Sequence, residues 1–153
     1  MMNKIDLRKP TSIDDDYALW AAEQAALIRG GKFDRAELEN IAGELDFLGN
    51  SQQNEIESRL NVLIAHLLKW HFQPGNRSNS WKATLLEQRT QIGRIIRRSP
   101  SLKGHPAGVI DEEYRIGRLK ASGETGLPET AFPQSCPYTI EQILDPSFHP
   151  DAE

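Results

Sequence analysis

Apolar residues recur at steps of three and four along most of the chain, which is the spacing of an amphipathic α-helix. No segment shows the alternating apolar and polar residues of a convincing strand. We therefore predict an all-α fold, a single-domain bundle of about five helices. The helices are expected at about residues 14–29, 34–48, 51–73, 80–98 and 106–122.

The chain changes character after Gly126, where proline and aromatic residues replace the helical pattern. Only a short helix is expected in this part, over residues 140–144 after Thr139. We interpret residues 127–153 as an irregular, proline-rich C-terminal strap over the bundle. At the other end of the chain, residues 1–12 are expected to be flexible.

Residues that favour helix starts and helix ends set the predicted boundaries. Asp34 stands where an N-cap is expected, and Glu37 follows three residues later as in a capping box. Gly49 comes directly after the last apolar residue of the 34–48 segment, which is the usual place of a glycine C-cap. Because the connection is so short, we expect the helices at 34–48 and 51–73 to pack antiparallel.

Length and composition indicate one ordinary globular domain. The 153 residues are 38% hydrophobic and 26% charged, which is typical neither of disordered chains nor of membrane proteins. The longest apolar run of the chain is far too short to span a bilayer, and the polar N-terminus lacks the apolar region of a secretory signal. A single cysteine, Cys136, agrees with a reducing compartment. We therefore expect a cytoplasmic protein.

One helix carries a line of polar and aromatic side chains beside its apolar stripe. The line lies on the predicted 51–73 helix, and its members fall within roughly 60° of arc at about 100° per residue. Such a seam is either a ligand or catalytic site or a set of hydrogen bonds to a neighbouring helix, and the residue types do not decide between the two. Its members are Glu55, Arg59, His66, Trp70 and Gln73.

The predicted helix at 80–98 places Gln88 and Arg89 in the middle of its apolar arc. A guanidinium in that position is at least partly desolvated, so Arg89 needs either an acidic partner or a ring of carbonyl acceptors. The best acidic candidates are Glu44 and Glu55. We expect a polar layer through the bundle made of Gln24, Glu44, Glu55, Arg59, His66, Gln88 and Arg89.

The spacing of Arg59 and His66 is similar to the Arg-x4-6-His signature of the helical HEPN-type ribonucleases. In such an enzyme the arginine stabilises phosphate charge, and the histidine exchanges protons with the ribose 2′-hydroxyl or the leaving oxygen. Those enzymes usually have a polar residue directly after the arginine, whereas this chain has Leu60. The alternative is a histidine satisfied by neighbouring side chains within a structural layer, and we favour it.

Several strings of the sequence together resemble the bacterial domain of unknown function number 29, an all-helical family without an assigned activity. They are WAAEQAALIRGGKFD, ELENIAGELDFLG, RLNVLIAHLLKW, SWKATLLEQRTQI, SPSL and ETGLPETAFPQSCPYTIEQIL. Where the family pattern usually has an acidic residue, this chain has Gly43, which weakens any interpretation built on paired carboxylates. The resemblance implies that the polar positions to mutate first are Glu44, Arg59, His66, Lys69, Trp70, Trp81, Gln88 and Arg89.

We expect no metal and no cofactor. His66 and His71 lie about 140° apart around their helix, so they do not converge on one ion. A mixed site of His66 with Glu44 and Glu55 has little support, and no zinc motif is present. The sequence offers no base for a nucleophilic Cys136. Glycine pairs serve here as helix stops and not as a phosphate loop.

The leading functional hypothesis is a non-enzymatic helical module that binds a protein partner or itself. Phe47 and Val62 are candidate apolar contacts outside the main stripes. The alternative is a metal-independent ribonuclease that uses Arg59 and His66. The net charge of −4 argues against nucleic-acid binding, and cations at the end of the 80–98 helix complement its dipole. No membrane association is expected.

Overall fold

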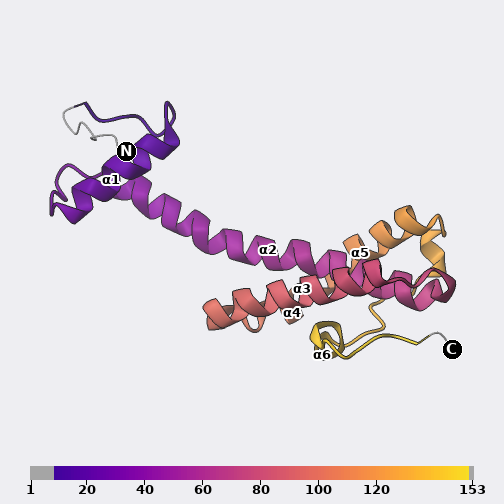
Figure 1. Cartoon of the computed structure of the whole chain (residues 1–153). Coiled ribbons are helices and arrows are strands. Elements are labelled where there is room, and N and C mark those ends of the chain that lie inside the picture. Colours follow the sequence, from indigo (N-terminus) through magenta and orange to yellow (C-terminus); the bar gives the residue numbers. More distant parts are fainter. Residues whose placement is uncertain (1–8, 152–153) are drawn as a thin grey trace. The chain divides into compact units, whose positions relative to one another are not determined.

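The computed structural model describes residues 9–151, in which every regular element is helical and no strand occurs. The predicted all-α class is therefore confirmed. The four residues 9–12 of the segment expected to be flexible are described, and residues 1–8 lie outside the described part. The α-helices, labelled in Figure 1, are α1 Tyr17–Arg29, α2 Leu38–Phe72, α3 Asn79–Arg98, α4 His105–Gly108, α5 Ile110–Thr125 and α6 Ile140–Leu144. Three short 3-10 helices lie at Pro74–Asn76, Pro100–Leu102 and Glu129–Ala131.

Contacts within the chain gather in two compact units, Met1–Gly49 and Asn50–Glu153. We call them the first unit and the second unit, and describe each by itself. The first unit contains α1 and the beginning of α2, and the second contains the remainder of α2 and all later helices. The organisation of the chain as a single domain stays a prediction.

The predicted break between two helices at Gly49 is wrong. The structure has one helix of 35 residues, α2, where helices at 34–48 and 51–73 were expected to pack antiparallel. A glycine inside a helix costs only about 1 kcal/mol relative to alanine. The apolar positions Leu45 and Ile56 are eleven residues apart, about three full helical turns, so the apolar stripe continues in phase through the glycine.

The start of α2 also differs from the expected capping box. The helix begins at Leu38, and residues 33–35 form a turn in which the amide of Arg35 donates to the carbonyl of Lys32. The end of α1 is as predicted, because Gly30 caps it and Gly31 adopts a positive φ of 70°. Such a backbone conformation favours glycine.

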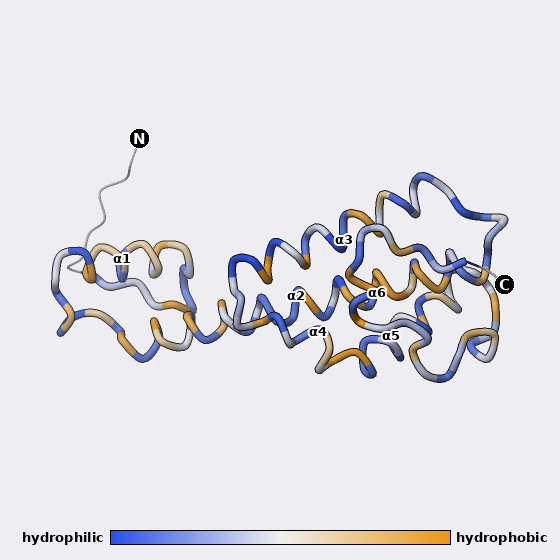
Figure 2. Tube along the Cα trace, turned by 90° about the horizontal axis from the view of Figure 1, so that it is seen from below, coloured by the Kyte–Doolittle hydropathy of each residue, from blue (hydrophilic) through white to orange (hydrophobic). Residues whose placement is uncertain are grey.

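The second unit has a well-buried apolar core. Figures 1 and 2 both show α3 and α5 running beside the later part of α2. The strap that follows α5 contributes to the same core, as predicted, and the capping box at Thr139 starts α6 at the expected residue. Core residues exposed by 7% or less include Leu60, Leu63, Ile64, Leu67, Leu68, Leu85, Ile92, Tyr114, Ala121, Phe132, Tyr138 and Ile143.

Two boundaries in the second unit are shifted from their predicted positions. Ser78, and not Ser80, caps α3 by accepting a hydrogen bond from the amide of Trp81. The predicted helix at 106–122 is divided at Val109 into α4 and α5. Among the described helices, none combines the length and the apolar composition required to cross a membrane.

The helices α5 and α2 approach closely at Gly117. A Cβ atom added to this glycine would lie 2.8 Å from Cγ2 of Ile64 and 2.9 Å from the carbonyl oxygen of Asn61. Both distances are shorter than van der Waals contact, so a glycine is needed for this packing. Beside it, the side-chain amide of Asn61 donates to Glu113 at 2.9 Å and its oxygen accepts from Lys120 at 2.6 Å.

Candidate functional site

The seven residues of the expected polar layer are distributed over both units. Gln24 and Glu44 belong to the first unit, and the other five belong to the second. The hydrogen bonds of these residues are local to each unit, and only Glu55, Arg59 and Gln88 among the seven are bonded to one another. Whether these residues form a functional site stays a prediction.

Gln24 is a structural residue of the first unit. Its side-chain amide donates to the carboxylate of Glu37 at 2.9 Å, and its oxygen accepts from the amide of Glu37 at 2.8 Å. The same carboxylate accepts from the indole N–H of Trp20 at 2.7 Å. These bonds fix α1 to the start of α2. Glu37, expected in a capping box, is instead the acceptor that satisfies two buried side chains.

Glu44 lies on α2 within the same unit and faces Tyr17. The hydroxyl of Tyr17 donates to a carboxylate oxygen of Glu44 at 2.5 Å. This hydrogen bond raises the pKa of Tyr17, because loss of the phenolic proton would place two negative charges together. Both residues line a groove described below.

Arg59 is hydrogen-bonded to two other members of the layer, Glu55 and Gln88. Its Nε–H donates to Glu55 one helical turn earlier at 3.0 Å, and an Nη–H donates to the side-chain oxygen of Gln88 on α3 at 3.2 Å. Arg59 and Glu55 are both partly exposed. This contact ties α2 to α3 and is worth little more than a surface ion pair with one added hydrogen bond.

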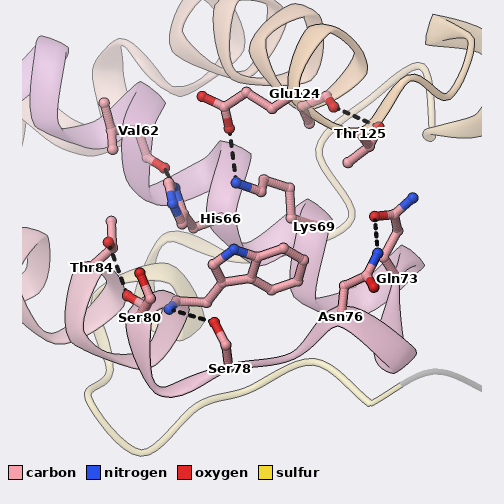
Figure 3. A network of polar contacts seen from close by, with 12 residues as sticks. Val62, His66, Lys69, Gln73, Asn76, Ser78, Ser80, Thr84, Glu124 and Thr125 are labelled. Atoms are coloured by element: carbon pink, nitrogen blue, oxygen red, sulfur yellow. Dashed lines mark hydrogen bonds and ion pairs between the residues drawn. The ribbon is translucent and has the colours of Figure 1, made fainter.

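His66 is half-buried and bonded to its own helix. Its Nδ1 lies 2.9 Å from the carbonyl oxygen of Val62. Figure 3 marks this contact with a dashed line. A carbonyl only accepts, so Nδ1 carries a proton and donates it to this bond. Burial lowers the pKa of His66, and the nearby Lys69 lowers it further. The lowered pKa favours the neutral imidazole, in which Nε2 has no proton. His66 and Arg59 share no hydrogen-bond partner.

Lys69 has an acidic partner and an aromatic one. Its ammonium lies 3.0 Å from a carboxylate oxygen of Glu124 on α5, a contact marked in Figure 3. It also lies 4.8 Å from the ring centre of Trp81 on α3. The cation is mostly buried and is stabilised by both contacts. The two contacts join α2, α3 and α5 of the second unit, so Lys69 has a structural role there.

Arg89 uses carbonyl acceptors, the second of the two arrangements expected for it. Its Nε–H donates to the carbonyl of Ile143 at 2.8 Å, and its Nη2 donates to those of Phe148 at 2.9 Å and Gln142 at 3.3 Å. The acidic partners proposed from the sequence, Glu44 and Glu55, are not its hydrogen-bond partners. Only 5% of Arg89 is exposed. The guanidinium thus fastens the C-terminal strap to α3.

Among the described residues, no group of three or more histidine, cysteine, aspartate and glutamate side chains is placed to hold a metal ion. His71 lies 2.9 Å from the hydroxyl of Tyr138 in the strap. Cys136 is half-buried, and its thiol donates to the carbonyl of Tyr138 at 3.4 Å. Burial raises the pKa of Cys136, so the thiolate that a nucleophile requires is disfavoured.

The first unit contains an apolar groove between α1 and the beginning of α2. It has a volume of about 400 Å³, and Trp20 is buried in it. Large apolar residues on both walls are exposed: Tyr17 by 55%, Ile28 by 38%, Leu45 by 64% and Leu48 by 60%. In Figure 2 apolar colouring recurs along α1 and the first turns of α2. The lining consists of Tyr17, Trp20, Ala21, Gln24, Ala25, Ile28, Ile41, Glu44, Leu45 and Leu48.

The helical spacing of the predicted 34–48 segment puts Leu45 and Leu48 on one apolar stripe, and such a stripe on a helix of a bundle is expected to face the interior. In the structure both are largely exposed, so this expectation is wrong for the described chain. Phe47 is exposed as expected, by 64%, whereas Val62 is only half-exposed. A second hollow beside the groove is lined by Phe47 and Ile13, and shares Tyr17 with it.

The groove has the chemistry of a binding surface. Its two polar side chains, Gln24 and Glu44, are engaged by Glu37 and Tyr17, and its remaining lining is aliphatic or aromatic. The spacing of Tyr17, Trp20 and the later apolar residues of α1 was visible in the sequence. That spacing predicts an apolar face but does not tell whether the chain itself covers it.

Fold and groove together define an all-α protein with an apolar helix-lined surface. The sequence model of one family, Domain of unknown function DUF29, matches residues 13–149. The chain therefore belongs to this family, as its resemblance predicted. No curated protein and no solved structure matches the chain.

Proposed function

We propose that this protein is a non-enzymatic helical module that binds a protein helix in the groove of its first unit. The observation that carries the proposal is the exposure of Leu45 and Leu48 opposite Tyr17 and Ile28. A contiguous apolar patch of this kind is typical of interaction sites.

The walls of the groove suit a helical ligand. Tyr17, Ala21 and Ile28 follow one another at helical steps on α1, and Ile41, Leu45 and Leu48 do so on α2. An amphipathic helix binds such a groove through apolar anchors at the same spacing. Trp20 forms the buried floor of the groove. Its indole N–H is bonded to Glu37, so it needs no hydrogen-bond partner from a ligand.

Site-specific photo-crosslinking in cells tests this function. A photoreactive amino acid at Leu45 is expected to give a reproducible covalent adduct with a protein of defined mass. The matched control places the same amino acid at Leu86, which is 58% exposed on α3 of the second unit. Adding Leu48→Glu is expected to abolish the adduct at position 45. Absence of any adduct at Leu45, or an equal adduct at Leu86, would contradict the proposal.

The ribonuclease alternative stays a prediction with one supporting observation. In the neutral imidazole of His66 the proton lies on Nδ1, which donates to Val62, so Nε2 has the form of a general base. Against it, Arg59 is engaged by Glu55 and Gln88. If RNA is cleaved by the purified protein, both His66→Ala and Arg59→Ala should abolish cleavage, and persistence in both variants would exclude this mechanism.

A further inference from the structure

We infer that the groove of the first unit is occupied by the first unit of a second copy of this chain, so that α1 and the start of α2 form a four-helix interface with their two-fold mates. This inference rests on the proposed function and names its partner. Three features support a second copy: the amount of apolar surface, the matching pattern of its two walls, and the charge distribution along α1.

The exposed apolar surface has the size that a stable dimer requires. Five residues at the groove and its neighbouring hollow, Tyr17, Ile28, Leu45, Phe47 and Leu48, are exposed by 38 to 64%. At roughly 150 Å² for a large side chain, they present about 400 Å² of apolar surface. A standard interface takes about 800 Å² from each partner, a little over half of it apolar. One copy of the first unit thus supplies nearly the whole apolar share.

Two helices with apolar faces on the same side form half of a four-helix bundle. The hydrogen bonds of Glu37 to Trp20 and Gln24 hold α1 and α2 in this arrangement. A second pair with the same pattern places apolar side chains against each wall of the groove. A two-fold axis makes such a contact closed, because each copy offers and receives the same surface.

The charged residues at the two ends of α1 have opposite signs, so they complement those of a second α1 that runs antiparallel to it. Asp14 and Asp15 are exposed just before the helix, and Arg29 and Lys32 are exposed at and beyond its end. When α1 lies antiparallel to α1 of the second copy, the acidic end of each helix meets the basic end of the other. A parallel arrangement would bring like charges together, so the charge pattern favours the antiparallel two-fold contact.

The first test is the mass of the full-length protein in solution, measured by sedimentation equilibrium. Wild type is expected to sediment as a dimer of twice the 17.3 kDa chain. The double variant Leu45→Ser/Leu48→Ser is expected to raise the dissociation constant at least about 100-fold, at about tenfold for each lost anchor. Leu86→Ser, an equally exposed leucine in the second unit, should leave the dimer unchanged.

The second test reverses the charges of α1. Arg29→Glu/Lys32→Glu is expected to weaken the dimer, and so is Asp14→Lys/Asp15→Lys, because each pair then faces charges of its own sign. Combining all four substitutions exchanges the two ends and should restore dimerisation. Failure of the combined variant to recover, while each pair alone weakens the dimer, would overturn the antiparallel arrangement. All four positions are exposed, and circular dichroism checks that helix content is retained.

The outcomes separate this inference from the proposed function. A wild-type protein that stays monomeric at about 100 μM, or a dimer that Leu45→Ser/Leu48→Ser leaves intact, overturns self-association through the groove. If crosslinking at Leu45 then gives an adduct with a different protein, the proposed function stands and its partner is that protein. If no adduct forms either, both fail.

Discussion

The guanidinium Nε–H of Arg89 donates to the carbonyl oxygen of Ile143 at 2.8 Å, and joins residues 54 positions apart in the sequence. The same side chain also donates to the carbonyls of Phe148 and Gln142, and the Gln142 carbonyl accepts from the amide of Asp145 as well. Replacing Arg89 with methionine removes all three of its hydrogen bonds to the strap. We expect the free energy of unfolding to fall by about 2 to 4 kcal/mol, measured by urea denaturation.

Arg94 provides the control for that substitution. It lies exposed on the same helix, so Arg94→Met is expected to change stability by less than about 0.5 kcal/mol. Arg89→Lys keeps the charge but cannot reproduce the planar fork, and its stability should fall between wild type and Arg89→Met. Equal stabilities for Arg89→Met and Arg94→Met would contradict the structural role of Arg89.

Gly117→Ala should destabilise the second unit by about 1 to 3 kcal/mol, although alanine favours helices. The added methyl group would meet Ile64 and the backbone of Asn61 at less than 3 Å. Gly123→Ala on the same helix is the matched control, because a Cβ there meets nothing within 4 Å. It is expected to raise stability by about 0.5 to 1 kcal/mol. Thermal and urea unfolding compare the two, and a stabilising Gly117→Ala would disprove the close approach.

Burial raises the pKa of Glu113 from its ordinary 4.5, and neighbouring Glu57 and Glu112 raise it further. Between pH 4.5 and the raised pKa, the folded protein holds more protons than the unfolded chain, so this group makes stability fall as pH rises. Glu113→Gln removes that penalty and keeps an acceptor for Asn61. The variant should therefore be more stable than wild type at pH 7, and in urea denaturation this gain should shrink as the pH falls from the raised pKa to 4.5. A gain independent of pH would point to a different cause.

His66→Ala is expected to lower the free energy of unfolding by about 1 to 2 kcal/mol at pH 7, because the hydrogen bond to Val62 and part of the buried surface are lost. Burial lowers the pKa of His66 below its ordinary 6.5, so in wild type the unfolded chain takes up this proton first as pH falls. As the pH falls, the free energy of unfolding of the wild type therefore decreases, whereas the variant has no imidazole at position 66 and lacks this decrease. The difference between the two should narrow from pH 7 towards pH 5, and a constant difference would exclude the linkage to His66.

The course of α2 shows where local sequence rules mislead. Gly49 has the position of a helix stop, yet the stripe through Leu45, Leu48, Ile56 and Leu60 stays in phase across it. A glycine costs the helix about 1 kcal/mol, which the apolar face of a long helix offsets. The phase of the apolar stripe on the two sides of Gly49 indicates one continuous helix, and the glycine alone does not indicate a break.

The sequence predicts that the Arg89 side chain needs hydrogen-bond acceptors, but it does not predict which groups these are. Its place in the apolar arc of α3 showed that buried acceptors were required. Two of the acceptors are backbone carbonyls in the short helix α6 and the third is that of Phe148. Every residue type carries a carbonyl, so the sequence does not mark which of them Arg89 binds. The groove posed a similar difficulty, since Leu45 looks the same in a sequence whether its own chain or another molecule covers it.

The hydrogen bonds between Arg89 and the strap also determine when the second unit can close during synthesis of the chain. Its three acceptors follow it by 53 to 59 residues. At the roughly 5 to 20 residues per second of protein synthesis, the ribosome adds Arg89 about 3 to 12 s before the last of these carbonyls exists. During that interval the guanidinium remains hydrated, and the surface that the strap later covers is open. The closing of the second unit is therefore a late event in the synthesis of the chain, set by the distance along the sequence between one arginine and its acceptors.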